Sequence, residues 1–187
     1  MDVFTGLFSA FGLSASAGLN AYIPLLVIAL LARFTDWIHL SPPWDTLTHP
    51  AVIAVLIILT GIEFFADKIP AVNHFNDAIQ TFVRPVAGAI AFAAGSGTLG
   101  EVHPALAMIA GLLIAGSVHA TKSLAVRPAV SVATAGTGHV PVSIMEDVAA
   151  TTVSLVAVLV PLALLVVAVI VLIWALRWRR RVHARRE

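Results

Sequence analysis

The chain has 187 residues, of which 59% are hydrophobic and only 11% are charged, and its mean hydropathy is +0.98. This balance excludes an ordinary soluble domain and indicates an integral membrane protein. Because a spanning helix takes roughly 20 apolar residues, the chain has room for about four to six membrane-embedded segments. The sequence has no cysteine, which excludes disulfides, thiolate metal ligands and cysteine nucleophiles.

The first apolar stretch, Val3 to Phe34, is too long for one untilted span and is interrupted by GLSASAGLN and then by Pro24. Two structures fit this pattern. One is a helix with a face of small residues for close packing, and the other is a broken or re-entrant helix whose freed backbone groups line a polar cavity. In either case the amide of Asn20 needs partners inside the bilayer.

A second span is predicted after an interfacial loop that carries tryptophans. Thr48 is expected to cap this helix and Pro50 to occupy its first turn. The span should end near Ala66, because Pro70 cannot continue the helix.

A mixed polar and apolar stretch follows at Ala71 to Val83 and predicts a short amphipathic or re-entrant helix. Arg84 precedes Pro85, which predicts a break there. The apolar segment Val86 to Ala94 is too short to span a bilayer unless part of the mixed stretch continues it.

The remaining segments are a fourth span, an irregular stretch and a last helix. The fourth span is predicted at Pro104 to Ala120, and the irregular stretch at Thr121 to Val140. The last helix is predicted to begin near Ser143 and to run beyond Trp174.

Two short internal similarities suggest a weak repeat. GLSASAGLNA aligns with GLLIAGSVHA, which places Asn20 opposite His119, and both Arg84 and Arg127 precede a proline. The matches are short, so chance and a two-repeat fold both remain open.

Glu63 and Asp67 lie one helical turn apart, so their carboxylates share a helix face and repel if both are ionised. Either a cation lies between them or one is protonated. Lys68 and Arg84 are the nearest basic residues in the sequence. Three interpretations follow: a cation or proton site, an anion site at the basic pair, or an ion-pair cluster that anchors the helix end.

Glu146 and Asp147 lie where the last helix begins. Ser143 and Glu146 match a capping box, so Glu146 could simply start the helix. Asp147 is not used by that motif, and it belongs to a polar strip that either lines a path or packs against Lys122 and Arg127. His119, one turn before Lys122, is interpreted first as hydrogen-bonded structure and only second as a ligand.

Motifs of nucleophilic, metalloprotease or phosphate-binding enzymes are absent from the sequence, so we predict no enzyme and no cofactor. The C-terminus carries six of the eleven basic residues, which places it in the cytoplasm by the positive-inside rule. The same basic run could also bind anionic lipids.

Four motifs together indicate a family: SASAGLNAYIPLL, IEFFADKIPAV, RPVAGAI and MEDV. The chain resembles the bacterial membrane proteins grouped as domain of unknown function 4126, over roughly Gly12 to Leu165. The resemblance implies a compact polytopic inner-membrane protein and supplies no mechanism. The residues that match its polar motifs are Asn20, Glu63, Asp67, Lys68, Arg84, Lys122, Glu146 and Asp147.

The sequence thus predicts an all-α, polytopic helical bundle of about five spans, with residues 1–176 in one transmembrane domain and residues 177–187 as a basic cytoplasmic tail. The predicted function is a transporter or channel-like protein for a small ion or polar solute, oligomeric and without nucleic-acid partners. The alternative is an accessory or scaffold subunit of a membrane complex. The candidate binding residues are Asn20, Glu63, Asp67, Lys68, Arg84, His119, Lys122, Glu146 and Asp147.

Overall fold

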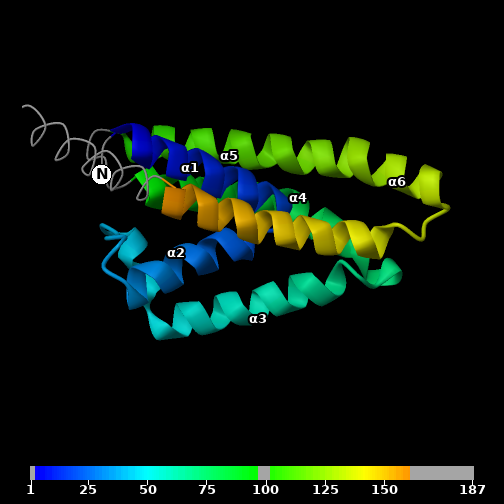
Figure 1. Cartoon of the computed structure of the whole chain (residues 1–187), viewed down its shortest axis with the longest axis horizontal. Helices are drawn as coiled ribbons and strands as arrows, with labels where there is room; N and C mark the ends of the chain where they lie inside the picture. The colour runs from blue at the N-terminus through cyan, green and yellow to red at the C-terminus, as the bar shows by residue number, and fades with distance from the viewer. Residues whose placement is uncertain (1–2, 97–101, 161–187) are drawn as a thin grey trace, which may run out of the picture.

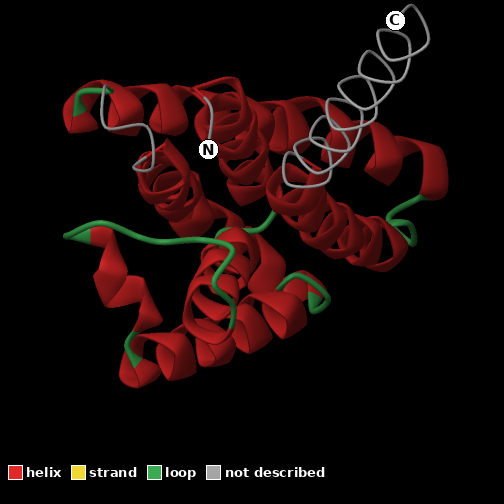
Figure 2. Ribbon diagram, turned by 60° about the vertical axis from the view of Figure 1, so that its left-hand side comes forward, coloured by secondary structure: helices red, strands yellow, loops and turns green. Residues whose placement is uncertain are grey.

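The structure, a computed structural model, describes residues 3–96 and 102–160. This part of the chain consists of helices and their connections, as Figure 2 shows, so the predicted all-α class is confirmed. The α-helices are α1 (Val3–Leu19), α2 (Tyr22–Phe34), α3 (Pro50–Ala66), α4 (Pro70–Ser96), α5 (Pro104–Thr121), α6 (Arg127–Thr134) and the 139–160 helix (His139–Val160). A short helix, η1 (Trp44–Thr48), precedes α3, and a π-helical segment, η3 (Lys122–Val126), joins α5 to α6.

The first apolar stretch folds as a hairpin of two short helices. α1 runs into the bundle, the chain turns at Asn20 and Ala21, and α2 returns to the end from which α1 started (Figure 1). The break has a local cause, because Pro24 has no N–H to donate to the carbonyl of Asn20, four residues earlier. The prediction of a broken first helix is therefore confirmed.

Small residues bring α1, α4 and α5 into close contact. A methyl group added at Gly111 of α5 would collide with the backbone of α4, at Gly88 and Ala89. α1 also contacts the 139–160 helix, where the hydroxyls of Ser16 and Ser154 form a hydrogen bond at 2.8 Å. The predicted small-residue face and the predicted break thus occur in the same helix, where the sequence left them as alternatives.

α3 has the predicted bounds, but its capping residue is different. His49 accepts a hydrogen bond from the backbone N–H of Ala51, and Pro50 occupies the first turn. The hydroxyl of Thr48 instead donates to the carbonyl of Asp45. The prediction that Thr48 caps this helix is wrong, because the helix begins one residue later.

α4 corrects the predicted break at Arg84 and Pro85. It is one helix of 27 residues with Pro85 inside it. Neighbouring helices make an internal proline tolerable in a membrane bundle, and here Pro85 lies beside Gly116 of α5.

Two further expectations are wrong. The stretch predicted as irregular from Thr121 is helical through η3 and α6, up to Thr134. The last helix begins at His139, so Ser143 lies inside it and cannot form a capping box. The predicted extension beyond Trp174 and the basic tail 177–187 lie outside the described residues.

Three helical stretches of the described chain are long and apolar enough to cross a membrane: Phe75–Ser96, Pro104–Thr134 and His139–Val160. α3 is apolar but shorter, and its outward side chains Ile58, Ile62 and Phe65 are exposed. Such a surface fits a lipid bilayer, because a soluble monomer rarely exposes so large an apolar area.

Candidate functional site

The break between α1 and α2 is satisfied by side chains from distant parts of the chain. The carbonyl of Asn20's side chain accepts hydrogen bonds from the backbone N–H groups of Tyr22 and Ile23, both at 3.1 Å. The N–H of Ala21 donates to the carboxylate of Glu63 at 3.1 Å. The first donors of α2 are thus paired although they lie inside the bundle, where unpaired groups are costly.

The end of α1 meets a positive charge in the same way. The ammonium of Lys122 donates to the carbonyl oxygen of Leu19 at 3.0 Å. Glu63 therefore faces the partial positive charge at the start of α2, and Lys122 faces the partial negative charge at the end of α1. Each charge has the sign that stabilises its helix end.

Arg84 is the cation that lies between the carboxylates of Glu63, in α3, and Asp67, directly after α3. Its Nη2 lies 2.8 Å from Oε1 of Glu63 and 3.5 Å from Oδ2 of Asp67. Arg84 is fully buried and Glu63 is 1% exposed. The predicted repulsion between Glu63 and Asp67 is thus resolved by a cation.

His119 completes the surroundings of Arg84. Nη1 of Arg84 lies 3.2 Å from Nδ1 of His119, and a guanidinium has no acceptor, so Nδ1 must accept this hydrogen bond. The imidazole is then neutral, and its Nε2–H donates to the hydroxyl of Thr81 at 3.2 Å. The histidine is hydrogen-bonded structure in this arrangement, which was the first of the two predicted interpretations.

Asp67, in the turn between α3 and α4, lies among three cations. Its Oδ2 is 3.2 Å from Arg127, 3.5 Å from Arg84 and 3.8 Å from Lys122, and its Oδ1 accepts from Asn76 at 2.7 Å. Burial by itself would raise the pKa of Asp67, but the three cations and the Asn76 hydrogen bond outweigh it. The pKa of Asp67 consequently lies below its ordinary value.

Glu146 is shared by two cations. Its Oε2 lies 2.8 Å from Nζ of Lys122 and 3.3 Å from Nη2 of Arg127. Arg127 also binds Oδ2 of Asp77 through Nη1, at 2.6 Å. Glu146 therefore joins the 139–160 helix to η3 and α6, and it does not start a helix as the capping-box interpretation supposed.

Asp147 and Lys68 form a separate arm of the site. Nζ of Lys68 lies 3.0 Å from Oδ2 of Asp147 and 3.2 Å from the centre of the Phe64 ring. The other carboxylate oxygen of Asp147 accepts from the side-chain amide of Asn20 at 3.0 Å. This arm returns to the turn between α1 and α2 and so closes the site.

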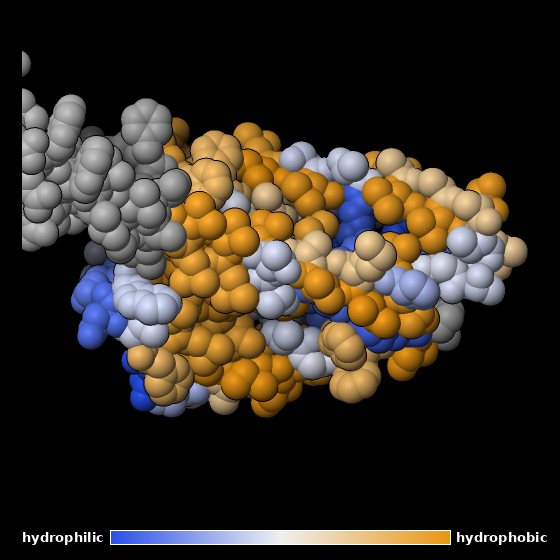
Figure 3. Space-filling view, viewed as in Figure 1, coloured by the Kyte–Doolittle hydropathy of each residue, from blue (hydrophilic) through white to orange (hydrophobic). Residues whose placement is uncertain are grey.

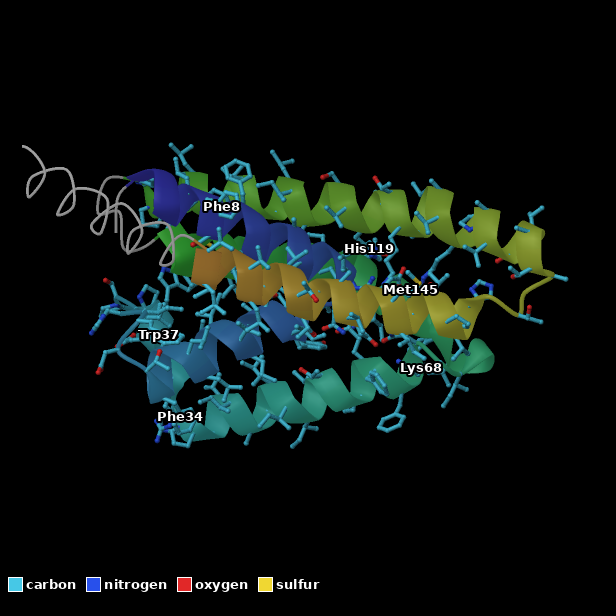
Figure 4. The ribbon with its side chains drawn as sticks, in the orientation of Figure 1. Phe8, Phe34, Trp37, Lys68, His119 and Met145 are labelled. Atoms are coloured by element: carbon cyan, nitrogen blue, oxygen red, sulfur yellow. The ribbon has the colours of Figure 1, made fainter. Side chains whose placement is uncertain are left out.

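The ion pairs around Asp67 and Glu146, together with the Lys68–Asp147 pair that Asn20 links to the turn between α1 and α2, are called the charged network. The term is used here for nine residues: Glu63, Asp67, Lys68, Asp77, Arg84, Lys122, Arg127, Glu146 and Asp147. The network connects α3, α4, η3, α6 and the 139–160 helix around the turn between α1 and α2. Figure 4 labels Lys68 and His119 in this region, and Phe34 and Trp37 at the opposite end of the bundle.

Two grooves reach the charged network. The lateral groove, about 540 Å³, is largely apolar and is lined by Leu19, Ser117, Val118, Thr121, Lys122, Val126, Val142, Met145, Glu146 and Ala149. Figure 3 shows hydrophilic atoms in a hollow bordered by hydrophobic ones, between α5–α6 and the 139–160 helix. The second groove, about 460 Å³, is lined by Asp77, Ser123, Arg127, Pro128, Ser131, Val132 and His139.

The π-helical segment η3 lies at the inner wall of both grooves, because Lys122 and Val126 line the lateral groove while Ser123 lines the second. A π-helical turn adds a residue to a helix and changes the direction of the side chains that follow. It is followed by Arg127 and Pro128, and Arg127 turns into the network. Local π-helical turns of this kind are frequent at functional sites.

All nine predicted binding residues meet around the turn between α1 and α2, seven of them in the charged network and Asn20 and His119 bonded to it. The prediction missed Asp77 and Arg127 as site residues. α4 has a buried polar face, on which Asn76, Gln80 and Arg84 recur every four residues. This face is visible in the sequence and could have identified Asp77, next to Asn76, as a site residue. Within residues 3–96 and 102–160, no group of three His, Asp or Glu side chains is arranged so that it could hold a metal ion.

The fold and the site together define an α-helical membrane protein with a buried charged network. The family described as "Domain of unknown function (DUF4126)" matches residues 7–181, so the chain belongs to this family, and the predicted resemblance is confirmed. No curated protein and no solved structure matches the chain.

Proposed function

We propose that the protein is a small membrane transporter or channel-like protein for a small ion or polar solute, and that the charged network is its binding site. The observation that carries the proposal is the interrupted pair α1 and α2, whose ends meet the network inside the bundle. Interrupted helices recur at the binding sites of secondary transporters, which is an argument by analogy. Buried ionisable groups in a membrane bundle are costly and often mark an ion or solute path.

The lateral groove supplies the place where a solute would meet the network. Lys122 and Glu146 line it, while its other walls are mostly apolar. Glu63 and Arg84 are further inside and are bonded to each other and to the helix break. We therefore assign contact with the solute to Lys122 and Glu146, and we assign the positioning of the helix ends to Glu63 and Asn20.

The proposed membrane arrangement follows from Figure 1, in which α3, α4, α5–α6 and the 139–160 helix run along the bundle in alternating directions. The α1–α2 hairpin would enter the bilayer and return, so that Val3 and Val160 end on the same side. Of the about five spans expected from the sequence, this arrangement makes the first a re-entrant hairpin, which was one of the two possibilities left open, and keeps four through-spans. With a cytoplasmic C-terminus in the inner membrane of a bacterium, the N-terminus would also be cytoplasmic.

A second candidate, an accessory or scaffold subunit, is favoured by one observation. The cations of the charged network are all paired with carboxylates of the same chain, as a network built only for stability would be. The two candidates differ in whether the isolated protein moves an ion.

Flux in proteoliposomes separates them. We expect proton or small-cation flux with the wild type, its loss in Glu146→Gln, and its retention in Asp36→Asn, which makes the same chemical change at an exposed residue outside the network. The three proteins are compared at equal amounts of folded protein. Absence of flux from folded wild type would contradict the proposal and favour the accessory role.

A further inference from the structure

The charges of the network do not balance. Among the described residues it contains four cations, Lys68, Arg84, Lys122 and Arg127, against five carboxyl groups, Glu63, Asp67, Asp77, Glu146 and Asp147. His119 adds no charge, because its hydrogen bond with Arg84 requires the neutral ring. If all five carboxyl groups were ionised, the network would carry one more negative than positive charge, which is unfavourable for the members that are buried away from water.

Hydrogen bonding decides which carboxyl group can carry a proton. A protonated carboxyl needs one oxygen free of donors, because that oxygen becomes a donor itself. Both oxygens of Glu63 accept from N–H groups, and so do both oxygens of Asp67 and Asp147. These three groups therefore use both oxygens as acceptors, which leaves neither oxygen free to become a donor.

Glu146 and Asp77 differ from the other three. Oε1 of Glu146 and Oδ1 of Asp77 are buried and have no hydrogen-bond partner among the described residues. The side chain of Glu146 is 10% exposed, whereas the side chain of Asp77 is 24% exposed at the edge of the network. The hydroxyl oxygen of Ser143, one turn before Glu146, is likewise buried and has no hydrogen-bond partner in the described part of the chain.

We propose that the charged network binds one proton and that this proton resides on Oε1 of Glu146. The inference deepens the proposed function, on which it rests for its role in transport, and names the proton as the ion that the site takes up. Protonation of Oε1 leaves Oε2 free to accept from Lys122 and Arg127, so both ion contacts persist as hydrogen bonds. The network is then electrically neutral.

The charged groups around Glu146 set the conditions for this proton. Glu146 faces two cations, Lys122 from η3 and Arg127 from α6. Asp67 of the α3–α4 turn shares both cations, and Asp77 of α4 lies on the other side of Arg127. Asp147 is adjacent to Glu146 on the same helix. Arg127 thus bridges the two carboxyl groups that have a free oxygen. Asp77 and Arg127 line the second groove, and Lys122 and Glu146 line the lateral groove. The proton site is therefore adjacent to both grooves.

Infrared difference spectroscopy tests the proton directly and without transport. Purified protein in lipid nanodiscs is titrated with acid and base, and the carbonyl stretch of a protonated carboxyl is identified by its shift in heavy water. We expect this signal in the wild type, its loss in Glu146→Gln, and its retention in Asp36→Asn, which removes an exposed carboxyl outside the network and leaves the charge of the network unchanged. A size-exclusion profile verifies that each variant is folded.

Two results would overturn the inference: a wild type without a buried protonated carboxyl, or a signal that persists in Glu146→Gln and disappears only in Asp77→Asn. If the Glu146 signal is found but proteoliposomes show no flux, the proton site stands and the transport function fails. If flux is found but the Glu146 signal is absent, the protein transports another ion and the proton site is refuted.

Discussion

Replacing Glu63 by glutamine should destabilise the protein because Glu63 serves two structural elements at once. Its carboxylate binds Arg84 at 2.8 Å and 3.2 Å and accepts the N–H of Ala21 at the start of α2. In Glu63→Gln the fully buried Arg84 retains only the 3.5 Å contact to Asp67 among its ion pairs. Breaking a buried pair by removing one partner costs about 3–5 kcal/mol of unfolding free energy.

The assay is reversible denaturation in mixed micelles, followed by circular dichroism, for Glu63→Gln, Arg84→Met and the double variant. If the two side chains act as a pair, the double variant loses less stability than the sum of the single variants, by about 0.5–3 kcal/mol. The reference is Asp36→Asn, because Asp36 is exposed and outside the network. Additive losses, or a Glu63→Gln variant as stable as this reference, would refute the pairing and its link to the helix break.

Three further predictions follow from the packing, the charge and the topology. Gly111→Ala should cost about 1–3 kcal/mol of unfolding free energy, because its methyl group would collide with α4. Gly61→Ala should cost nothing, since no atom lies within 4 Å of the added carbon. Equal melting curves for the two variants would contradict this prediction. The pKa of Asp67 is lower in the folded chain than in the unfolded chain, so its stabilising contribution is complete above about pH 3.9 and is lost as the pH falls through the folded value. On acid titration, Asp67→Asn should therefore lose less unfolding free energy than the wild type. Parallel stability curves for the two proteins would contradict this prediction. Because the chain has no cysteine, Asp36→Cys and Thr137→Cys can each be labelled selectively, and we expect opposite membrane sides for the two; labelling from one side would contradict the bundle orientation.

The sequence predicted well what local physics determines. α3 has its predicted bounds because Pro50 starts a helix and Pro70 cannot continue one. The interruption after Leu19 was also predictable, since Asn20 and Pro24 oppose a continuous helix in the same turn.

Elements that depend on tertiary contact were predicted less well. Pro85 does not end α4, because neighbouring helices support the chain there. Ser143 and Glu146 match a capping box, but the helix begins four residues earlier and Glu146 is drawn to Lys122. A local motif cannot reveal such a partner.

The site residues were predictable as a set but not in their pairing. Charges in an apolar sequence stand out, and this sufficed to select Glu63, Asp67 and Arg84. The sequence suggests Arg127 only as a packing partner of the polar strip, and it places Asp77 in the mixed stretch Ala71 to Val83. Their role follows only from the contacts that α6 and α4 make across the bundle.

The most direct test of the account is proton flux through the purified protein in proteoliposomes under an imposed pH gradient. An entrapped fluorescent indicator reports the internal pH, and wild type, Glu146→Gln and Asp36→Asn are compared at equal folded amounts. We predict flux with the wild type and Asp36→Asn and a loss to the level of empty liposomes with Glu146→Gln. Equal flux in all three proteins would contradict the charged network as the site of transport.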